Sequence, residues 1–168
     1  IHYITESEIN KAKPYLQDKI KSDKIISLIL GGPNKYYNFN NDQLIKIFSK
    51  IKSEFISKGY KIIVIPSMRT PKRSVELANK EMGTCGYVVN NVDKQAYLSA
   101  YALANYVIVT CDSTSMISEA ATSGKPIFVA HMNAKKDNYR FKKFFELFKT
   151  MGIIRDLGEK VETWTYKK

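Results

Sequence analysis

A hydroxyl-rich turn between two apolar segments is the part of this chain whose residue types could do chemistry. Asp112, Ser113, Thr114 and Ser115 follow a buried-strand pattern and open a short helical pattern. The N–H groups and the dipole at a helix N-terminus attract anions, and hydroxyls can add hydrogen bonds. Glu119 lies four residues after Ser115, so the two share a helix face. The spacing predicts a phosphate at the turn and a sugar diol at the carboxylate.

Two further turns follow apolar runs and carry groups that suit an anion. Gly31 and Gly32 allow close backbone approach, and Ser67, Arg69 and Thr70 include one of only four arginines in the chain. The carboxyl ends of parallel strands share one edge of a sheet, so the three turns can converge. Each turn alone is better explained by local structure, as a glycine turn, a solvated arginine or a helix cap. The three together favour a ligand site.

The elements that must position these turns alternate regularly along the chain. Strands are expected at 24–30, 61–65, 87–89, 106–110 and 127–130, and helices at 5–21, 40 or 41–57, 70–82, 94–104, 114–123 and 138–150. Thr5 and Glu8 have capping-box spacing, and Thr70 and Pro71 are expected as an N-cap and first helical residue. The tail from Gly158 is expected to be a surface strand or loop. The alternation predicts an α/β fold, a Rossmann-like parallel sheet with helices on both faces, as one domain over 1–168.

Composition excludes several classes of protein. No apolar run approaches the roughly 20 residues that span a bilayer. The net charge is +11, from 27 basic and 16 acidic residues. Because lysine dominates and arginine favours base readout, we expect no specific nucleic-acid partner. The chain begins with Ile1, so we expect it to be a piece of a longer protein.

Cysteine and histidine do not form a recognisable metal or nucleophile motif. Cys85 and Cys111 lack partners at ligand spacing, and His2 and His131 stand alone, so we expect no metal, no cofactor and a cytoplasmic location. A catalytic thiol at Cys111 is considered and disfavoured because no histidine is near it in sequence. The dinucleotide glycine fingerprint, the Walker loop, the serine elbow and a glycosidase-type carboxylate pair are absent from the sequence.

The last expected helix mixes aromatic and basic side chains. It could be a membrane-surface or RNA-binding face. The favoured interpretation is an amphipathic cover helix with Phe141, Phe144, Phe145 and Phe148 facing the sheet.

Several motifs in order resemble one family. They are Gly31-Gly32-Pro33, Ser67-Met68-Arg69-Thr70-Pro71, the stretch from Val109 to Ala120, Gly124-Lys125-Pro126 and Trp164-Thr165-Tyr166. Together they resemble the carboxyl-terminal half of the bacterial and plant mitochondrial fission (elongated-mitochondria) family, which is similar to GT-B glycosyltransferases. This sequence has Met68 where the family usually has arginine, and Gln95-Ala96-Tyr97 where it usually has Asn-Pro-Tyr.

The resemblance implies a two-domain parent whose amino-terminal domain is missing here and usually supplies the acceptor site. The carboxyl-terminal domain would hold a nucleoside diphosphate or nucleotide-sugar, with Glu119 at the ribose and its helix end at the diphosphate. The retaining-type pair of glutamates is absent, because Cys111 occupies the earlier position. We therefore expect binding without catalysis by this chain alone. The expected ligand-binding residues are Gly31, Gly32, Ser67, Arg69, Thr70, Asp112, Ser113, Thr114, Ser115, Met116 and Glu119.

Two other functions stay open at this stage. One is a non-catalytic GT-B-like scaffold, peripheral to a membrane or recruiting proteins, as the plant members' link to mitochondrial division suggests. The other is a nucleic-acid binder, motivated by charge alone.

Overall fold

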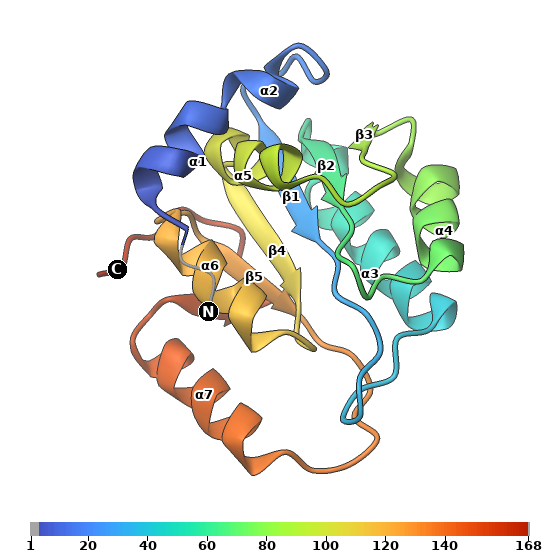
Figure 1. Ribbon diagram of the computed structural model, residues 1–168, viewed down its shortest axis with the longest axis vertical. Helices are drawn as coiled ribbons and strands as arrows, with labels where there is room; N and C mark the ends of the chain where they lie inside the picture. Colours follow the sequence, from blue (N-terminus) through green and yellow to red (C-terminus); the bar gives the residue numbers. More distant parts are fainter. Residues whose placement is uncertain (1–3, 168) are drawn as a thin grey trace.

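Six parallel strands form one sheet in the order β3-β2-β1-β4-β5-β6 (Figure 1). The computed structural model describes residues 4–167. The strands are β1 Ile25–Ile29, β2 Lys61–Ile65, β3 Gly86–Val88, β4 Tyr106–Thr110, β5 Ile127–Ala130 and β6 Ile154–Asp156. The helices are α1 Glu6–Ala12, α2 Pro14–Gln17, α3 Asn41–Glu54, the 3₁₀ turn η1 Ile56–Lys58, α4 Lys72–Met82, α5 Lys94–Leu103, α6 Thr114–Thr122 and α7 Tyr139–Thr150. The expected α/β, Rossmann-like fold is confirmed.

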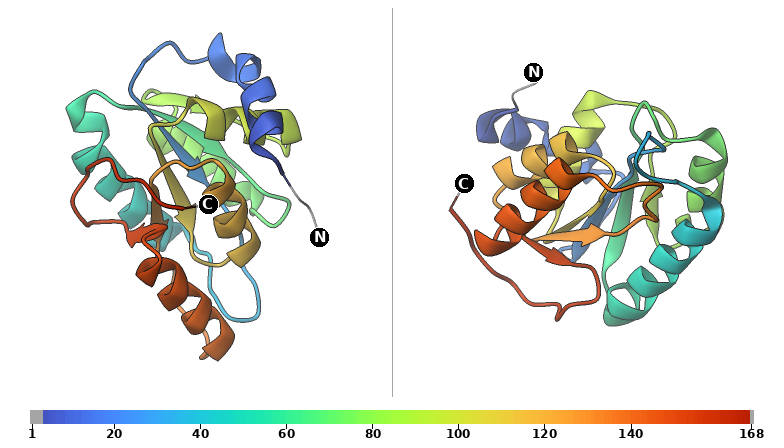
Figure 2. Two further views of the ribbon diagram at one scale, coloured as in Figure 1. Left: turned by 90° about the vertical axis from the view of Figure 1, so that its left-hand side faces the viewer. Right: turned by 90° about the horizontal axis from the view of Figure 1, so that it is seen from below.

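The strand order creates a switch point between β1 and β4. The chain moves outward from β1 through β2 to β3, then returns to β4 and continues outward on the other side. Figure 2 shows α3 and α4 on one face of the sheet and α1, α5, α6 and α7 on the other. Ligands of open α/β sheets bind where the strand order reverses, at the carboxyl ends of the strands. The turns after β2, β1 and β4 are neighbours at that edge.

Burial explains why these segments are strands. Every residue of β1, β4 and β5 is buried, as expected for parallel strands covered on both faces. The strand β5 contributes Phe128, whose ring lies 6.0 Å from Phe55 at the end of α3 and 5.2 Å from Trp164 in the tail. The tail after β6 is therefore irregular in backbone yet anchored to the core, by Trp164 and by Tyr166, whose hydroxyl donates to the carbonyl of Lys125 at 2.6 Å.

Helix α3 shows how sequence and packing agree. Asn40 accepts a hydrogen bond from the N–H of Gln43, the N-cap bond that the sequence allows at either Asn40 or Asn41. Four apolar residues at helical spacing, Leu44, Ile47, Phe48 and Ile51, are buried. Gly59 ends the following 3₁₀ turn with φ of 92°, which is a left-handed conformation that favours glycine.

The structure corrects several sequence-based elements. The first helix breaks before Pro14, because proline cannot donate the backbone hydrogen bond of a continuing helix. Strand β3 begins at Gly86 rather than residue 87, and β6 was missed because a three-residue edge strand carries little pattern. Thr70 does not cap α4; Pro71 is the N-cap and the helix begins at Lys72. The capping box of Thr5 with Glu8, in contrast, is confirmed.

Helix α7 packs against the molecule through its phenylalanines, as favoured from the sequence. Phe141 is 7% exposed, and Phe144, Phe145 and Phe148 are partly buried against the core. No helix within the described part of the chain is long and apolar enough to cross a membrane.

Candidate functional site

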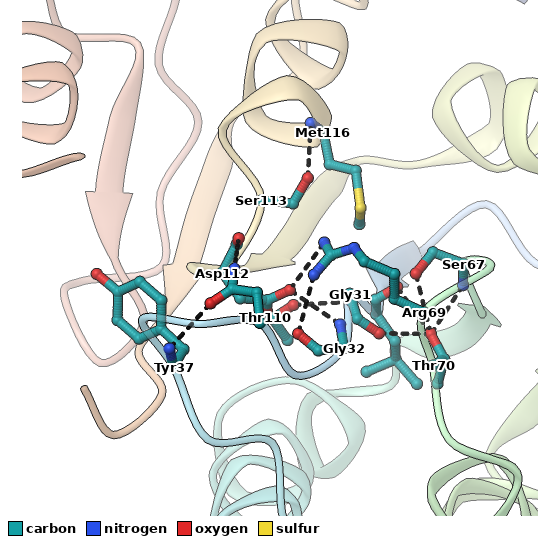
Figure 3. A network of polar contacts seen from close by, with 12 residues as sticks. Gly31, Gly32, Tyr37, Ser67, Arg69, Thr70, Thr110, Asp112, Ser113 and Met116 are labelled. Carbon is teal, nitrogen blue, oxygen red and sulfur yellow. Dashed lines mark hydrogen bonds and ion pairs between the residues drawn. The ribbon is translucent and has the colours of Figure 1, made fainter. Parts of the chain in front are cut away.

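Three turns meet at the switch point, as Figure 3 shows. The N–H of Gly31 donates to Thr110 Oγ1 at 2.9 Å, and the N–H of Gly32 donates to Asp112 Oδ2 at 2.9 Å. The first turn is thus joined to the end of β4 across about eighty residues of sequence. Arg69, in the turn after β2, joins this turn to the other two. Its guanidinium donates to the carbonyl of Gly32 at 3.0 Å and to Asp112 Oδ2 at 3.2 Å.

Asp112 and Arg69 hold the three turns at this edge of the sheet together. The Asp112 side chain is fully buried, and Oδ1 has no hydrogen-bonding partner among the described residues. The Arg69 side chain is 40% exposed, so one side of the guanidinium still faces solvent. The sequence predicted both residues as ligand contacts. The structure gives them an internal role, and contact with a ligand stays a prediction.

The two glycines are required by this close packing. A Cβ atom on Gly31 would overlap the carboxylate of Asp112, and one on Gly32 would overlap the backbone carbonyl of Arg69. Neither glycine has a positive φ. The glycines therefore allow close packing within the protein, against Asp112 and Arg69, rather than close approach of a ligand.

Thr70 and Ser67 complete the turn after β2. The Thr70 hydroxyl donates to the carbonyl of Gly31 and accepts from the N–H of Ser67 at 2.8 Å. The hydroxyl of Ser67 lies 3.2 Å from that of Thr70. Thr70 therefore closes its own turn, whereas Ser67 lines the adjoining pocket.

The N-terminus of α6 presents free backbone donors. Ser113 is the N-cap, and its Oγ accepts from the N–H of Met116 at 3.3 Å and lies 3.4 Å from Ser115 Oγ. Thr114 and Ser115 are exposed. Their N–H groups have no hydrogen-bonding partner among the described residues. A helix end of this kind favours an anion.

A pocket of about 240 Å³ lies beside this helix end. It is lined by the end of β1, by Ser67 and Met68, by the first turn of α5, and by Met116 and Glu119 of α6. Glu119 accepts a hydrogen bond from the hydroxyl of Tyr97 at 3.3 Å, and Tyr97 accepts one from the fully buried Tyr101 at 2.7 Å. Burial raises the pKa of both phenols, so both stay protonated donors at neutral pH.

The sequence-based site omitted the residues contributed by α5 and by the segment just before it. Val92, Asp93, Lys94 and Tyr97 line the pocket, and they come from the crossover between β3 and β4. The signal available in the sequence was the Tyr97 position of the family's Asn-Pro-Tyr motif. Tyr97 is a polar ring in an otherwise mostly apolar stretch, one turn after the N-cap Asp93.

Cys111 lies in the turn but is not poised for catalysis. It is buried, and burial raises the pKa of its thiol to about 12. Its Sγ accepts from the N–H of Met132 at 3.1 Å. Among residues 4–167, no group of three or more histidine, cysteine or acidic side chains could hold a metal ion.

Comparison with known proteins identifies relatives of the whole chain. The family model described as Mitochondrial fission ELM1 matches residues 1–168. The uncharacterized protein RP120 of Rickettsia prowazekii is 30% identical over 167 residues, which are 95% of this chain and 45% of that protein. The mitochondrial fission protein ELM1 of Arabidopsis thaliana is 23% identical over 173 residues, which are 99% of this chain and 40% of that protein. The chain therefore spans less than half the length of these relatives.

A solved structure shares the fold at low identity. The putative UDP-N-acetylglucosamine 2-epimerase of Listeria monocytogenes superposes with a TM-score of 0.56 and 12% identity, over 84% of this chain and 34% of that one. The GT-B-like, Rossmann-like fold that the motifs implied is confirmed.

Proposed function

We propose that this chain, which belongs to the mitochondrial fission ELM1 family, is the nucleotide-sugar-binding domain of a GT-B-like glycosyltransferase. One observation carries the proposal. A helix end with free N–H groups and a pocket that ends on an oriented carboxylate lie side by side at the switch point of the sheet.

The diphosphate would lie at the start of α6. The N-terminus of a helix carries about half a unit of positive charge, and the N–H groups of Thr114 and Ser115 are free to donate. The exposed side of Arg69 adds a charged donor that need not leave its internal partners.

The ribose would lie against Glu119, one turn further along α6. A carboxylate can accept from two adjacent hydroxyls, and the bond from Tyr97 holds one of its oxygens in place. The pocket next to it is mainly apolar, with Ile29, Pro66 and Met68 among its walls, and suits the flat face of a nucleobase. The donor therefore extends from the helix end into the pocket.

Binding is proposed without catalysis by this chain alone. Cys111 is buried with a raised pKa and cannot serve as a nucleophile at neutral pH. A two-domain parent would supply the acceptor site from its other domain.

Calorimetric titration with uridine diphosphate, guanosine diphosphate and UDP-N-acetylglucosamine tests the proposal. We expect saturable binding of at least one, and we expect Glu119→Gln to weaken it by about 1–3 kcal/mol because charged hydrogen bonds to the ribose are lost. Glu146→Gln removes an exposed carboxylate of α7 and serves as the matched control. Absence of binding at millimolar ligand, or equal affinity of the Glu119→Gln variant, would refute the proposal.

A membrane-peripheral scaffold is the second candidate, and one feature of α7 favours it. Three apolar side chains of this lysine-rich helix and its C-cap are exposed: Tyr139 (70%), Leu147 (56%) and the C-cap Met151 (52%). Flotation with vesicles of phosphatidylcholine and phosphatidylglycerol tests it. Leu147→Glu should abolish flotation, and no flotation of the unaltered chain would exclude this candidate.

A further inference from the structure

A second pocket, of about 440 Å³, opens between α3 and the ends of β5 and β6. Its polar walls are Gln43, Lys46 and Lys50 from α3 and His131 and Asn133 after β5. None of the residues that line it lines the pocket beside Glu119. The two pockets are on the same edge of the sheet but belong to different helices.

Gln43 is the unexplained group in this pocket. Both its amide nitrogen and its amide oxygen are shielded from solvent, and neither has a hydrogen-bonding partner among the described residues. A buried amide that makes no hydrogen bond costs free energy, so it calls for an explanation. A ligand that both accepts from the nitrogen and donates to the oxygen would satisfy it once the Gln43 side chain rotates its amide toward the pocket.

The charge of the pocket is positive. The side chain of Lys46 makes no hydrogen bond or ion pair with any residue of the described chain, and the ammonium of Lys50 donates only to the carbonyl of Leu157 at 3.3 Å. No carboxylate of residues 4–167 lines the pocket. Within the described chain, neither lysine forms an ion pair with a carboxylate.

His131 supplies a further acceptor. Its Nε2 lies 2.6 Å from Asp156 Oδ1, so this nitrogen carries the proton and donates to the carboxylate. In the neutral ring, Nδ1 is then an acceptor. The pocket thus combines two cationic donors with two acceptors, His131 Nδ1 and the oxygen of Gln43.

We propose that this pocket binds a phosphate ester that carries a free hydroxyl group, such as a polyol or sugar phosphate. The phosphate contacts Lys46 and Lys50, and lysine serves phosphate well as a point charge. The amide nitrogen of Gln43 donates to a phosphate oxygen, and the hydroxyl donates to the Gln43 oxygen or to His131. The same chemistry occurs in the headgroup of phosphatidylglycerol, so the test compares both sources.

The test titrates the chain with glycerol 3-phosphate and follows the side-chain amide signal of Gln43 by nuclear magnetic resonance. Inorganic phosphate and glycerol serve as separate probes. We expect the ester to bind more tightly than either and to shift the Gln43 signal. Lys46→Gln should weaken binding roughly tenfold, as loss of a charged hydrogen bond does. Gln43→Glu, which places a negative charge at the same position, should abolish it.

Lys61→Gln is the matched control, because Lys61 is an exposed lysine at the start of β2 on the opposite edge of the sheet. Circular dichroism of each variant checks that the fold is intact. Vesicles containing phosphatidylglycerol form the second arm, and binding there that requires Lys46 would assign the ligand to a lipid headgroup. Equal weakening by Lys61→Gln and Lys46→Gln, or no shift of Gln43 in either arm, would overturn the proposal. Uridine diphosphate should leave the Gln43 signal unchanged, which separates this pocket from the proposed donor site.

Discussion

Gly31 and Asp112 should be strongly coupled in stability, because the missing Cβ of one leaves the space that the carboxylate of the other occupies. The three atoms nearest to a Cβ built on Gly31 all belong to the Asp112 side chain. We predict that Gly31→Ala destabilises the unaltered chain markedly. We also predict that the same change costs much less when Asp112 has already been replaced by alanine.

The magnitudes follow from burial and contacts. Overpacking a rigid, buried position costs about 1–3 kcal/mol. Asp112→Ala removes a hydrogen bond between a charged acceptor and the buried N–H of Gly32, worth about 1.5–3 kcal/mol. The ion pair with Arg69 adds only about 0–1 kcal/mol, because the Arg69 side chain is 40% exposed and its charge is screened by solvent. The double variant should be more stable than the sum of the two single effects predicts by about 1–3 kcal/mol.

Urea unfolding of the four chains of this cycle measures the coupling. Gly32→Ala provides the control, because its Cβ would meet the backbone of Arg69, which the substitution of Asp112 leaves in place. Its cost should be similar in both backgrounds. The reasoning is refuted if Gly31→Ala costs the same with and without the Asp112 side chain.

Three further outcomes are expected. Tyr97→Phe should weaken nucleotide binding several-fold without unfolding the chain, since it removes only the hydroxyl that orients the pocket carboxylate; unchanged titration curves would contradict this. Cys111 should resist a thiol reagent at pH 8 while the partly exposed Cys85 reacts, because burial raises the Cys111 pKa to about 12; mass spectrometry of labelled peptides measures it. Burial alone would raise the pKa of Asp156, but hydrogen bonds from Lys149 and His131 lower it below the ordinary value of 3.8. The stability that Asp156 contributes is thus present above pH 3.8 and is lost as the pH falls through the lowered pKa, so Asp156→Asn should flatten the acid limb of a stability-against-pH curve.

Local pattern was sufficient for most of the elements. Strands such as Lys61–Ile65 and Tyr106–Thr110 were predicted to the residue, because buried parallel strands are continuous apolar runs between turn residues. Caps at Thr5 and Asn40 were also readable, since a cap involves residues three positions apart. The strand β6 was not readable, because its pairing with β5 rather than its own composition makes it a strand.

The sequence by itself determined an α/β chain with three anion-friendly turns after three strands, and the order of those strands then brought the turns together. Only the tertiary structure decided what each side chain does there. Asp112 binds Gly32 and Arg69 across 80 and 43 positions, and Tyr97 reaches Glu119 across 22. Contacts over such separations depend on helix placement and strand register to within an ångström, which no local pattern encodes. The residues at the site could therefore be predicted from the sequence. Which of them stabilise the fold and which face a ligand could not.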